Sequence, residues 1–320
     1  MNTDSILVTG GAGFIGSHTC DRLLETGRSV VCLDNFNDSY CPRAKRNNIK
    51  DALTNPRFKL VEGDILDVSL IGNILSHTGA DTVIHLAALA GVRNSIQAPL
   101  DYVDTDIKGT AAMLEACKTF GIRKFIFASS SSVYGLSQIP FREEDASGFQ
   151  CSPYAVAKYS GELFCRMYTH LYGISTVCLR FFTVYGPRQR PDMAIHKFAK
   201  AILEGSEICI FGDGSSSRDY TYIDDIVDGI ISSISLNCGF EAINLGNSCQ
   251  VNIMDLVKIM ENVLGKPAKI RFAEKQPGDV PSTCASIGKA AKLLGYRPKV
   301  SLEEGLRRFA EWFKAAHASS

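Results

Sequence analysis

Short apolar runs alternate with longer amphipathic segments through the first 180 residues of the chain. The runs are rich in β-branched and aromatic residues, and they predict strands at 5–9, 29–33, 58–61, 82–86, 124–128 and 175–181. The segments between them predict helices at 14–25, 69–76, 100–120 and 153–171. Strands that alternate with helices are typical of βαβ units, in which helices cover both faces of a parallel sheet. We therefore expect an α/β fold.

The alternation weakens after residue 181, where the chain becomes richer in glycine, proline and polar loops. This change predicts a smaller second lobe. The apolar run at 242–246 predicts a return of the chain to the first sheet, so the two lobes are expected to be interleaved in sequence. Near the end of the chain, apolar residues recur at helical spacing and predict a helix that faces the core. These residues are Leu302, Leu306, Phe309, Ala310 and Phe313.

The composition is electrically balanced, with 34 Lys and Arg residues against 34 Asp and Glu residues in a chain of 320. A protein without a net positive field is not expected to bind nucleic acid or an anionic membrane surface. No apolar run reaches the roughly 20 residues that span a bilayer, and the N-terminus lacks the features of a signal peptide. The 11 cysteines are scattered without a C-x-x-C pair, which favours a reducing cytoplasm and predicts no metal site.

The sequence TGGAGFIG at residues 9–16 lies between the first predicted strand and the first predicted helix. Glycines there allow a tight turn, a close approach of the backbone to a pyrophosphate, and a helix N-terminus that meets the anion. A glycine trio alone is a weak signal, but its place at the start of a βαβ unit strengthens it.

Asp34 stands at the end of the second predicted strand. An acid at this place bonds the adenosine ribose hydroxyls and repels the 2′-phosphate of NADP, so it favours NAD. The alternative is a solvated Asp that opens a turn. After this glycine loop, the cofactor role is the favoured interpretation.

Tyr154 and Lys158 stand four residues apart near the start of a predicted helix, which places both side chains on one face. An ammonium group beside a phenol favours the phenolate, which can act as a base at neutral pH. A Tyr-x-x-x-Lys pair arises by chance in many helices. Here the pair follows the glycine loop in α/β order, and the serine cluster 129–132 ends the preceding strand. We therefore interpret the pair as a candidate catalytic group.

Six motifs together resemble the extended short-chain dehydrogenase/reductase family and, within it, the nucleotide-sugar 4-epimerases. They are TGGAGFIG at 9–16, HLAA at 85–88, Ser130 with Tyr154 and Lys158, YGP at 185–187, RDYTYIDD at 218–225 and GD at 278–279. The resemblance implies a Rossmann-type doubly wound parallel sheet with a smaller C-terminal α/β lobe that binds substrate. It assigns residues 1–180, together with 219–247, to NAD, and residues 181–218 and 248–320 to the nucleotide sugar. It also implies a homodimer that packs through the helices at 100–120 and 153–171.

The same resemblance implies the chemistry of the site. Tyr154 would take the proton of the sugar 4-hydroxyl, Ser130 would orient or relay that proton, and Lys158 would hold the nicotinamide ribose and tune Tyr154. Hydride would leave C4 and return to the other face of a 4-keto sugar, so NAD would stay tightly bound and be regenerated in each cycle. The implied cofactor-binding residues are Gly10, Gly13, Phe14, Ile15, Gly16, Asp34, Asn35, Asp64, Ile65, Leu86, Ala87, Ala88 and Lys158.

Three further segments are most similar to UDP-glucuronate 4-epimerases: TVYGPRQRPDM at 183–193, residues 37–46, and QPGDV at 276–280. The resemblance therefore implies interconversion of UDP-glucuronate and UDP-galacturonate. Dehydrating and decarboxylating relatives usually carry acids where this chain has Ser131 and Ser132, so epimerisation without elimination is favoured.

A glucuronate oxidised at C4 is a β-keto acid that readily loses carbon dioxide, so its carboxylate has to be held. Hydroxyls of Ser131, Ser132 and Thr183, with Arg190 or Arg93, would supply the bonds. The alternative for each hydroxyl is an ordinary residue at a strand end or in a turn.

The nucleotide end of the substrate is also assigned by resemblance. Arg218 would pair with the diphosphate and Asp279 would meet the uridine ribose, while Phe211 and Tyr154 complete the implied substrate-binding set. The chain departs from the family pattern at Gln276, where many UDP-glucose 4-epimerases have an arginine. It departs again at Asp106, where an asparagine is expected, and this leaves the hydrogen bonding behind Tyr154 open.

Three alternatives stay open at this point. The chain is a UDP-glucose or UDP-N-acetylglucosamine 4-epimerase, a decarboxylating or dehydrating relative, or an NAD-binding regulator without catalysis. Regulators of the last kind usually lack the Tyr or the Lys, and this chain has both Tyr154 and Lys158.

Overall fold

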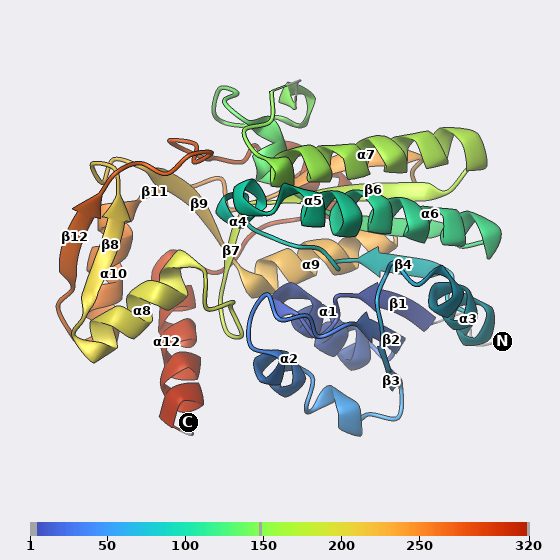
Figure 1. Cartoon of the computed structure of the whole chain (residues 1–320), viewed down its shortest axis with the longest axis horizontal. Coiled ribbons are helices and arrows are strands. Elements are labelled where there is room, and N and C mark those ends of the chain that lie inside the picture. Colours follow the sequence, from blue (N-terminus) through green and yellow to red (C-terminus); the bar gives the residue numbers. More distant parts are fainter. Residues whose placement is uncertain (1–4, 147–148, 319–320) are drawn as a thin grey trace.

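Seven parallel strands form the central sheet of the computed structural model, which describes residues 5–146 and 149–318 (Figure 1). The strand order is β3-β2-β1-β4-β5-β6-β10. The strands are β1 (Ser5–Thr9), β2 (Ser29–Asp34), β3 (Phe58–Glu62), β4 (Thr82–His85), β5 (Lys124–Ser130), β6 (Ser175–Phe181) and β10 (Phe240–Leu245). The first six confirm the predicted strands. The seventh confirms the return of the chain to the sheet near residue 242.

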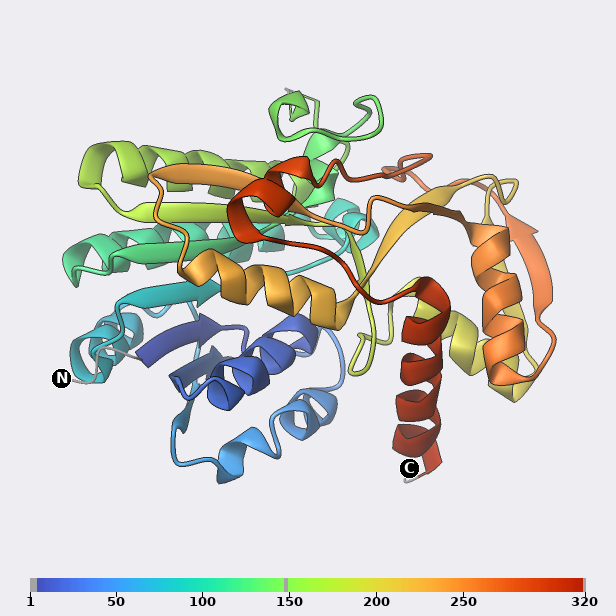
Figure 2. The same cartoon turned by 180° about the vertical axis from the view of Figure 1, so that it is seen from behind.

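Helices cover both faces of this sheet, as Figures 1 and 2 show from opposite sides. One face packs against α1 (Phe14–Glu25) and α9 (Ile223–Ile234). The other face packs against α3 (Val68–Thr78), α6 (Gly109–Thr119) and α7 (Pro153–Tyr172). Successive strand residues point to opposite faces, so Val8 joins the first core cluster and Leu7 joins the second. This arrangement confirms the predicted doubly wound parallel sheet.

The predicted helix at 100–120 is wrong in its middle. The chain forms the short helix α5 (Pro99–Tyr102), then a π-helical segment (Val103–Lys108), and only then α6. Asp106 on the π-helical segment is buried, and its carboxylate accepts the backbone N–H of Leu89 at 2.7 Å. Periodicity does not reveal such a widened turn, which is frequent at functional sites.

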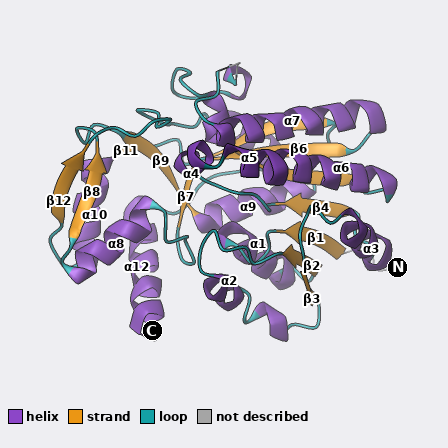
Figure 3. Ribbon diagram, in the orientation of Figure 1, coloured by secondary structure: helices purple, strands orange, loops and turns teal. Residues whose placement is uncertain are grey.

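The second lobe is smaller and contains two short sheets, which Figure 3 distinguishes by colour from the surrounding helices. β8 (Glu207–Phe211) pairs in parallel with β12 (Lys269–Ala273), and β9 (Ser217–Tyr222) lies between β7 (Thr183–Tyr185) and β11 (Gln250–Asn252). The helices of this lobe are α8 (Ala194–Glu204), α10 (Ile253–Leu264) and α12 (Leu302–Ala318). In α12, Leu306, Phe309, Ala310 and Phe313 are buried, which confirms the predicted core-facing helix.

The remaining helical elements are short. They are α2 (Pro42–Asn48), α4 (Val92–Gln97), α11 (Gly288–Leu294) and the 3-10 turns η1 (Ala52–Thr54), η3 (Ser131–Tyr134) and η4 (Glu143–Asp145). Within the described ranges, no helix has both the length and the apolar character that crossing a membrane requires.

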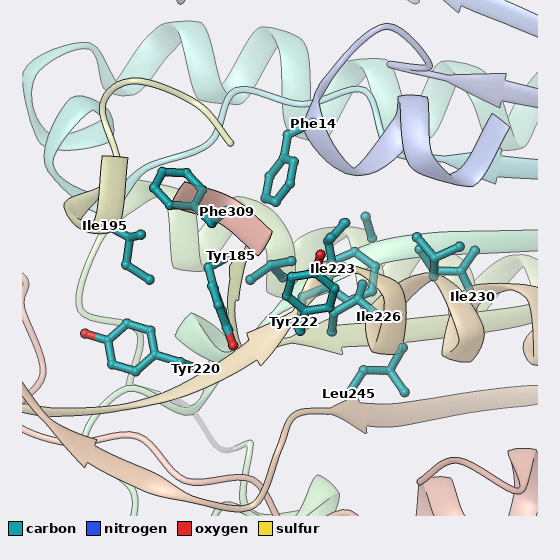
Figure 4. Packing of buried hydrophobic residues seen from close by; sticks show 14 of the residues in the cluster. Phe14, Tyr185, Ile195, Tyr220, Tyr222, Ile223, Ile226, Ile230, Leu245 and Phe309 are labelled. Carbon is teal, nitrogen blue, oxygen red and sulfur yellow. The ribbon is translucent and has the colours of Figure 1, made fainter. Parts of the chain in front are cut away.

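The two lobes share one hydrophobic core. Figure 4 shows Phe14 of α1 in the same cluster as Tyr185 of β7, Tyr222 of β9 and Phe309 of α12. Because aromatic side chains from both lobes pack together, the relative position of the lobes is fixed by apolar burial.

Candidate active site

The loop between β1 and α1 lies close to the backbone of the segment that follows β4. Gly10 has a φ of +67°, and a Cβ built there would lie 2.7 Å from the backbone nitrogen of Ala87. A Cβ on Gly16 would lie 2.1 Å from the carbonyl oxygen of Gly10. Gly13 is the N-cap of α1 and supplies no side-chain cap, so the first amides of the helix are available to an anion. The loop is a cradle that side chains would fill.

Asp34 ends β2 beside this cradle and is buried. Its Oδ2 accepts the backbone N–H of Ala12 at 3.0 Å, and its Oδ1 accepts that of Phe36 at 2.9 Å. Each oxygen keeps a further lone pair for a ligand. The carboxylate therefore fixes the glycine loop, and it also lies where the sequence predicts a bond to the adenosine ribose hydroxyls.

A cavity of about 480 Å³ lies at the carboxyl ends of the central strands. In open parallel sheets this is the edge at which ligands bind. The wall contains every residue that was named as an implied cofactor contact: Gly10, Gly13, Phe14, Ile15, Gly16, Asp34, Asn35, Asp64, Ile65, Leu86, Ala87, Ala88 and Lys158.

Tyr154, Lys158 and Ser130 line the same cavity. The helix α7 begins at Pro153, and the hydroxyl of the N-cap Ser152 accepts the N–H of Ala155 at 3.2 Å, so Tyr154 lies in the first turn. Lys158 is buried, and its Nζ lies 5.8 Å from the centre of the Tyr154 ring. A phenol, a buried ammonium group and a hydroxyl therefore share one cavity with the glycine loop.

Asp106, which departs from the family pattern, lies behind this pair. Its Oδ2 is 3.8 Å from Nζ of Lys158, and both side chains are almost completely buried. Burial raises the pKa of Asp106 to about 6, although Lys158 and the Leu89 N–H act to lower it.

His85 is a buried residue of the same region to which the sequence assigned no role. Its Nδ1 bonds to the hydroxyl of Thr9 at 2.8 Å and its Nε2 to the hydroxyl of Thr110 at 3.2 Å. Burial and then the charge of Lys158 lower the pKa of His85 to about 3, so the ring is neutral. His85 thus ties β1, β4 and α6 together beneath the cradle.

The wall of the cavity also contains most of the residues that were expected to bind substrate. These are Ser131, Ser132, Tyr154, Thr183, Arg190, Arg218 and Asp279. The hydroxyl oxygen of Ser132 is buried, and it has no hydrogen-bond partner among the described residues. A buried polar atom without a partner is uncommon and indicates a place for a polar ligand.

Arg93 and Phe211 do not line the cavity, but they adjoin it through Asp279. Nη2 of Arg93 lies 2.7 Å from Oδ2 of Asp279, and the guanidinium stacks 4.4 Å from the centre of the Phe211 ring. The three residues come from different parts of the chain, so their proximity depends on tertiary structure.

Arg190 is already paired on one side. Its Nε and Nη2 donate to the carboxylate of Asp192 at 2.9 and 2.6 Å, and Nη2 also donates to the carbonyl of Ala90 at 3.1 Å. The guanidinium has a second edge, Nη1, that takes no part in these bonds.

The structure adds wall residues that sequence reasoning missed, above all Tyr40 and Lys45. Nζ of Lys45 donates to the carbonyl of Asn37 at 2.8 Å and lies 4.8 Å from the centre of the Tyr40 ring. The phenol oxygen of Tyr40 is buried without a hydrogen-bond partner among the described residues. Both lie in the segment 37–46, which was noticed for its family resemblance but received no role.

The family model described as GDP-mannose 4,6 dehydratase matches residues 7–309 of the chain. A UDP-glucuronate 4-epimerase of Thermodesulfobacterium geofontis is 43% identical over 309 residues, which cover 96% of this chain and 95% of that protein. The crystal structure of a UDP-glucuronic acid 4-epimerase from Bacillus cereus, in complex with UDP-glucuronic acid and NAD, matches with a TM-score of 0.92 and 41% identity over 98% of this chain and 99% of that one. A UDP-glucose 4-epimerase of Thermotoga maritima with UDP-glucose matches with a TM-score of 0.90 and 34% identity over 98% and 99% of the two chains.

Proposed function

The chain belongs to the extended short-chain dehydrogenase/reductase family, and on that premise we propose that it is an NAD-dependent 4-epimerase that interconverts UDP-glucuronate and UDP-galacturonate. The observation that carries the proposal is one cavity whose wall holds the glycine loop together with Ser130, Tyr154 and Lys158. The UDP-glucuronate 4-epimerases of Thermodesulfobacterium geofontis and Bacillus cereus, at 43% and 41% identity, are more similar to this chain than the UDP-glucose 4-epimerase of Thermotoga maritima at 34%, and this supports glucuronate as the sugar.

The residues of the cradle fit NAD. Gly10 and Gly16 leave room where a Cβ would collide, and Asp34 stands where a ribose hydroxyl is expected. We assign the cofactor to residues 1–180 together with 219–247, and the sugar nucleotide to residues 181–218 and 248–320. NAD supplies the acceptor and the donor of a hydride at C4 of the sugar.

The side chains of this protein handle the proton. Tyr154 accepts the proton of the 4-hydroxyl when C4 is oxidised, and it returns that proton when C4 is reduced on the other face. Ser130 orients the hydroxyl. Lys158 stabilises the phenolate with its buried charge and holds the nicotinamide ribose. The 4-keto sugar turns over between the two half-reactions, so proton and hydride both return to the sugar and no net redox change results.

Ser131, Ser132, Thr183 and Arg190 hold the substrate carboxylate. The buried Ser132 hydroxyl without a partner among the described residues supports this assignment, because it could donate a hydrogen bond to a carboxylate oxygen. Bonds from several directions keep the bond to the carboxylate out of line with the π system of the C4 carbonyl. The β-keto acid is thereby prevented from losing carbon dioxide.

Incubation with UDP-glucuronate, followed by proton NMR of the products, tests the proposal. We expect UDP-galacturonate at equilibrium, and we expect Tyr154→Phe to lower kcat by about 10²-fold or more, as loss of a general base does. Tyr172→Phe is the control, because Tyr172 is half exposed at the far end of the same helix. A pentose product with carbon dioxide, or faster turnover of UDP-glucose, would contradict the substrate. Unchanged turnover in Tyr154→Phe would contradict the mechanism.

We also propose a homodimer that packs through α6 and α7, which lie side by side in Figure 1. Val156, Leu163, Met167 and Leu171 share one face of α7 and are 46%, 51%, 37% and 56% exposed. Contiguous exposed apolar surface of this kind marks protein interfaces. A second copy of the same face would cover it in a two-fold arrangement.

A role in cytoplasmic carbohydrate metabolism completes the proposal. All eleven cysteines are free thiols, which suits a reducing compartment. Cell fractionation with an antibody against the protein tests the location, and recovery in an oxidising compartment would contradict it.

A further inference from the structure

Asp106 is a buried carboxylate that the proposed reaction does not use. It lies on the π-helical segment Val103–Lys108, which packs against α7, and it is 2% exposed. Its Oδ1 accepts the N–H of Leu89, whereas its Oδ2 has no hydrogen-bond partner among the described residues. That Oδ2 lies 3.8 Å from Nζ of Lys158, and within the described part of the chain no other carboxylate lies within 4.0 Å of this ammonium group. Because buried charges are costly unless they are paired, each group is the counterion of the other.

We propose that Asp106 is a positioning residue that acts through Lys158: its negative charge offsets the ammonium group and so opposes the loss of the proton from Tyr154. The inference rests on the roles proposed for Tyr154 and Lys158. When Asp106 is ionised, the pair has no net charge. When Asp106 is protonated, one uncompensated positive charge faces Tyr154 and favours its phenolate.

The geometry places these groups within electrostatic reach. Nζ of Lys158 lies 5.8 Å from the centre of the Tyr154 ring. Tyr102, one helical turn before Asp106, has its ring centre 6.1 Å from that of Tyr154. Burial and then the charge of Asp106 raise the pKa of Tyr102, so this charge already acts on a phenol beside the catalytic one.

The charge of Asp106 changes close to physiological pH, because burial raises its pKa to about 6. Among the described residues, the other titratable groups that face the cluster include His85 from β4, Tyr102 from α5, and the ion pair of Arg190 and Asp192 from the segment after β7. Arg190 holds the pKa of Asp192 below its usual range, so Asp192 stays ionised between pH 5 and 8. His85 is neutral above about pH 3 and Arg190 is a permanent cation, so both keep one charge between pH 5 and 8. The raised pKa of Tyr102 keeps that phenol neutral over the same range.

The proposed consequence is that the phenolate of Tyr154 is protected against protonation as the pH falls. As the pH falls through about 6, Asp106 takes up a proton and the net positive charge beside Tyr154 increases. This increase favours the phenolate form of Tyr154 over the neutral phenol. A neutral residue at position 106 would give the same advantage at every pH.

The variant Asp106→Asn tests the proposal, because Asn keeps the shape and the acceptor for the Leu89 N–H but has no charge. Ultraviolet difference titration of the NAD-loaded protein, with the Tyr154→Phe spectrum subtracted, reports the phenolate of Tyr154. In Asp106→Asn we expect this signal to appear at a pH lower by about half a unit or more. The acid limb of kcat for UDP-glucuronate should move in the same direction.

Asp104→Asn is the matched control. Asp104 lies on the same π-helical segment, but its side chain is 63% exposed and 4.0 Å from Lys108. Neither the titration nor the acid limb should move in this variant.

The inference would be overturned if the Tyr154 phenolate signal of Asp106→Asn appeared at the same pH as in the wild-type protein, or at a higher pH. If neither the wild-type protein nor the variants epimerise any UDP-sugar, the proposed function fails, while the titration still decides the role of Asp106. If Asp106→Asn does not fold, the test uses the wild-type protein instead. Infrared difference spectra should then show a buried carboxyl group that ionises near pH 6, which is Asp106. Its ionisation should move to higher pH in Lys158→Met, and an unmoved signal would overturn the inference.

Discussion

Exchange of Glu162 for Gln should lower the free energy of unfolding by about 3–5 kcal/mol, the usual effect of leaving one partner of a buried ion pair alone. Oε1 and Oε2 of Glu162 on α7 accept hydrogen bonds from Nε and Nη2 of Arg180 on β6 at 2.8 and 2.7 Å. The side chain of Glu162 is 3% exposed and that of Arg180 is 4% exposed. Gln has nearly the same volume, but it cannot neutralise the guanidinium and it presents an N–H donor to another donor. Ser129 also donates to Glu162, so the pair fixes the residue that precedes Ser130.

Urea unfolding followed by circular dichroism, with NAD at the same excess throughout, measures this difference. Glu62→Gln is the control, because Glu62 pairs with Arg46 at 2.8 Å on the surface and its loss should cost less than about 1 kcal/mol. A loss below about 1 kcal/mol in Glu162→Gln would refute the reasoning. In that case the bonds from Arg180 to Tyr134 and to the carbonyl of Glu143 would suffice for the guanidinium. Replacement of both Glu162 and Arg180 by Met should recover most of the stability, because no buried charge then remains.

Three further predictions concern the cofactor, the dimer and pH. Gly16→Ala should weaken NAD binding by about 10- to 100-fold in calorimetry, since its Cβ would lie 2.1 Å from the Gly10 carbonyl oxygen; unchanged affinity would contradict the cradle. Leu163→Asp should give monomers in analytical ultracentrifugation, because it places a charge in the exposed apolar face of α7, and a persistent dimer would place the interface elsewhere. Burial raises the pKa of Asp106 in the folded protein to about 6, from its ordinary value of 3.8, so its contribution to stability is present at low pH and is lost as the pH rises through 6. Relative to Asp106→Asn, the wild-type protein should therefore lose about 2 kcal/mol between pH 4 and pH 7 in urea unfolding, and a constant difference would contradict the raised pKa.

The features that the sequence predicted well are those with local causes. The strand β1 is recognisable because all five of its residues are buried, so the apolar run is uninterrupted. The glycine loop is recognisable because Gly10 requires a left-handed conformation and Gly16 a close contact within the same turn. Such requirements restrict the residue type at a position, and they therefore leave a trace in the sequence.

The features that were missed depend on contacts between distant parts of the chain. Arg93 and Asp279 are 186 residues apart, and only the folded chain shows that they pair at the rim of the cavity. The contact between Asp106 and Lys158 requires the π-helical turn, which does not alter the apolar pattern of residues 100–120. Lys45 is polar in sequence but buried in the structure, where its ammonium group donates a hydrogen bond to the backbone carbonyl of Asn37.

The place of β10 in the central sheet also constrains biosynthesis. β10 is an outer strand of the sheet, and it pairs with β6 from Phe240 to Leu245, so the ribosome makes it only after the first part of the second lobe, residues 181–218. Until these residues leave the ribosome, the nascent chain holds β6 as an open edge with unpaired backbone groups, a template for aggregation. The N-terminal half is therefore an unfinished unit, and a message truncated before codon 240 should yield a chain that depends on chaperones and is readily degraded.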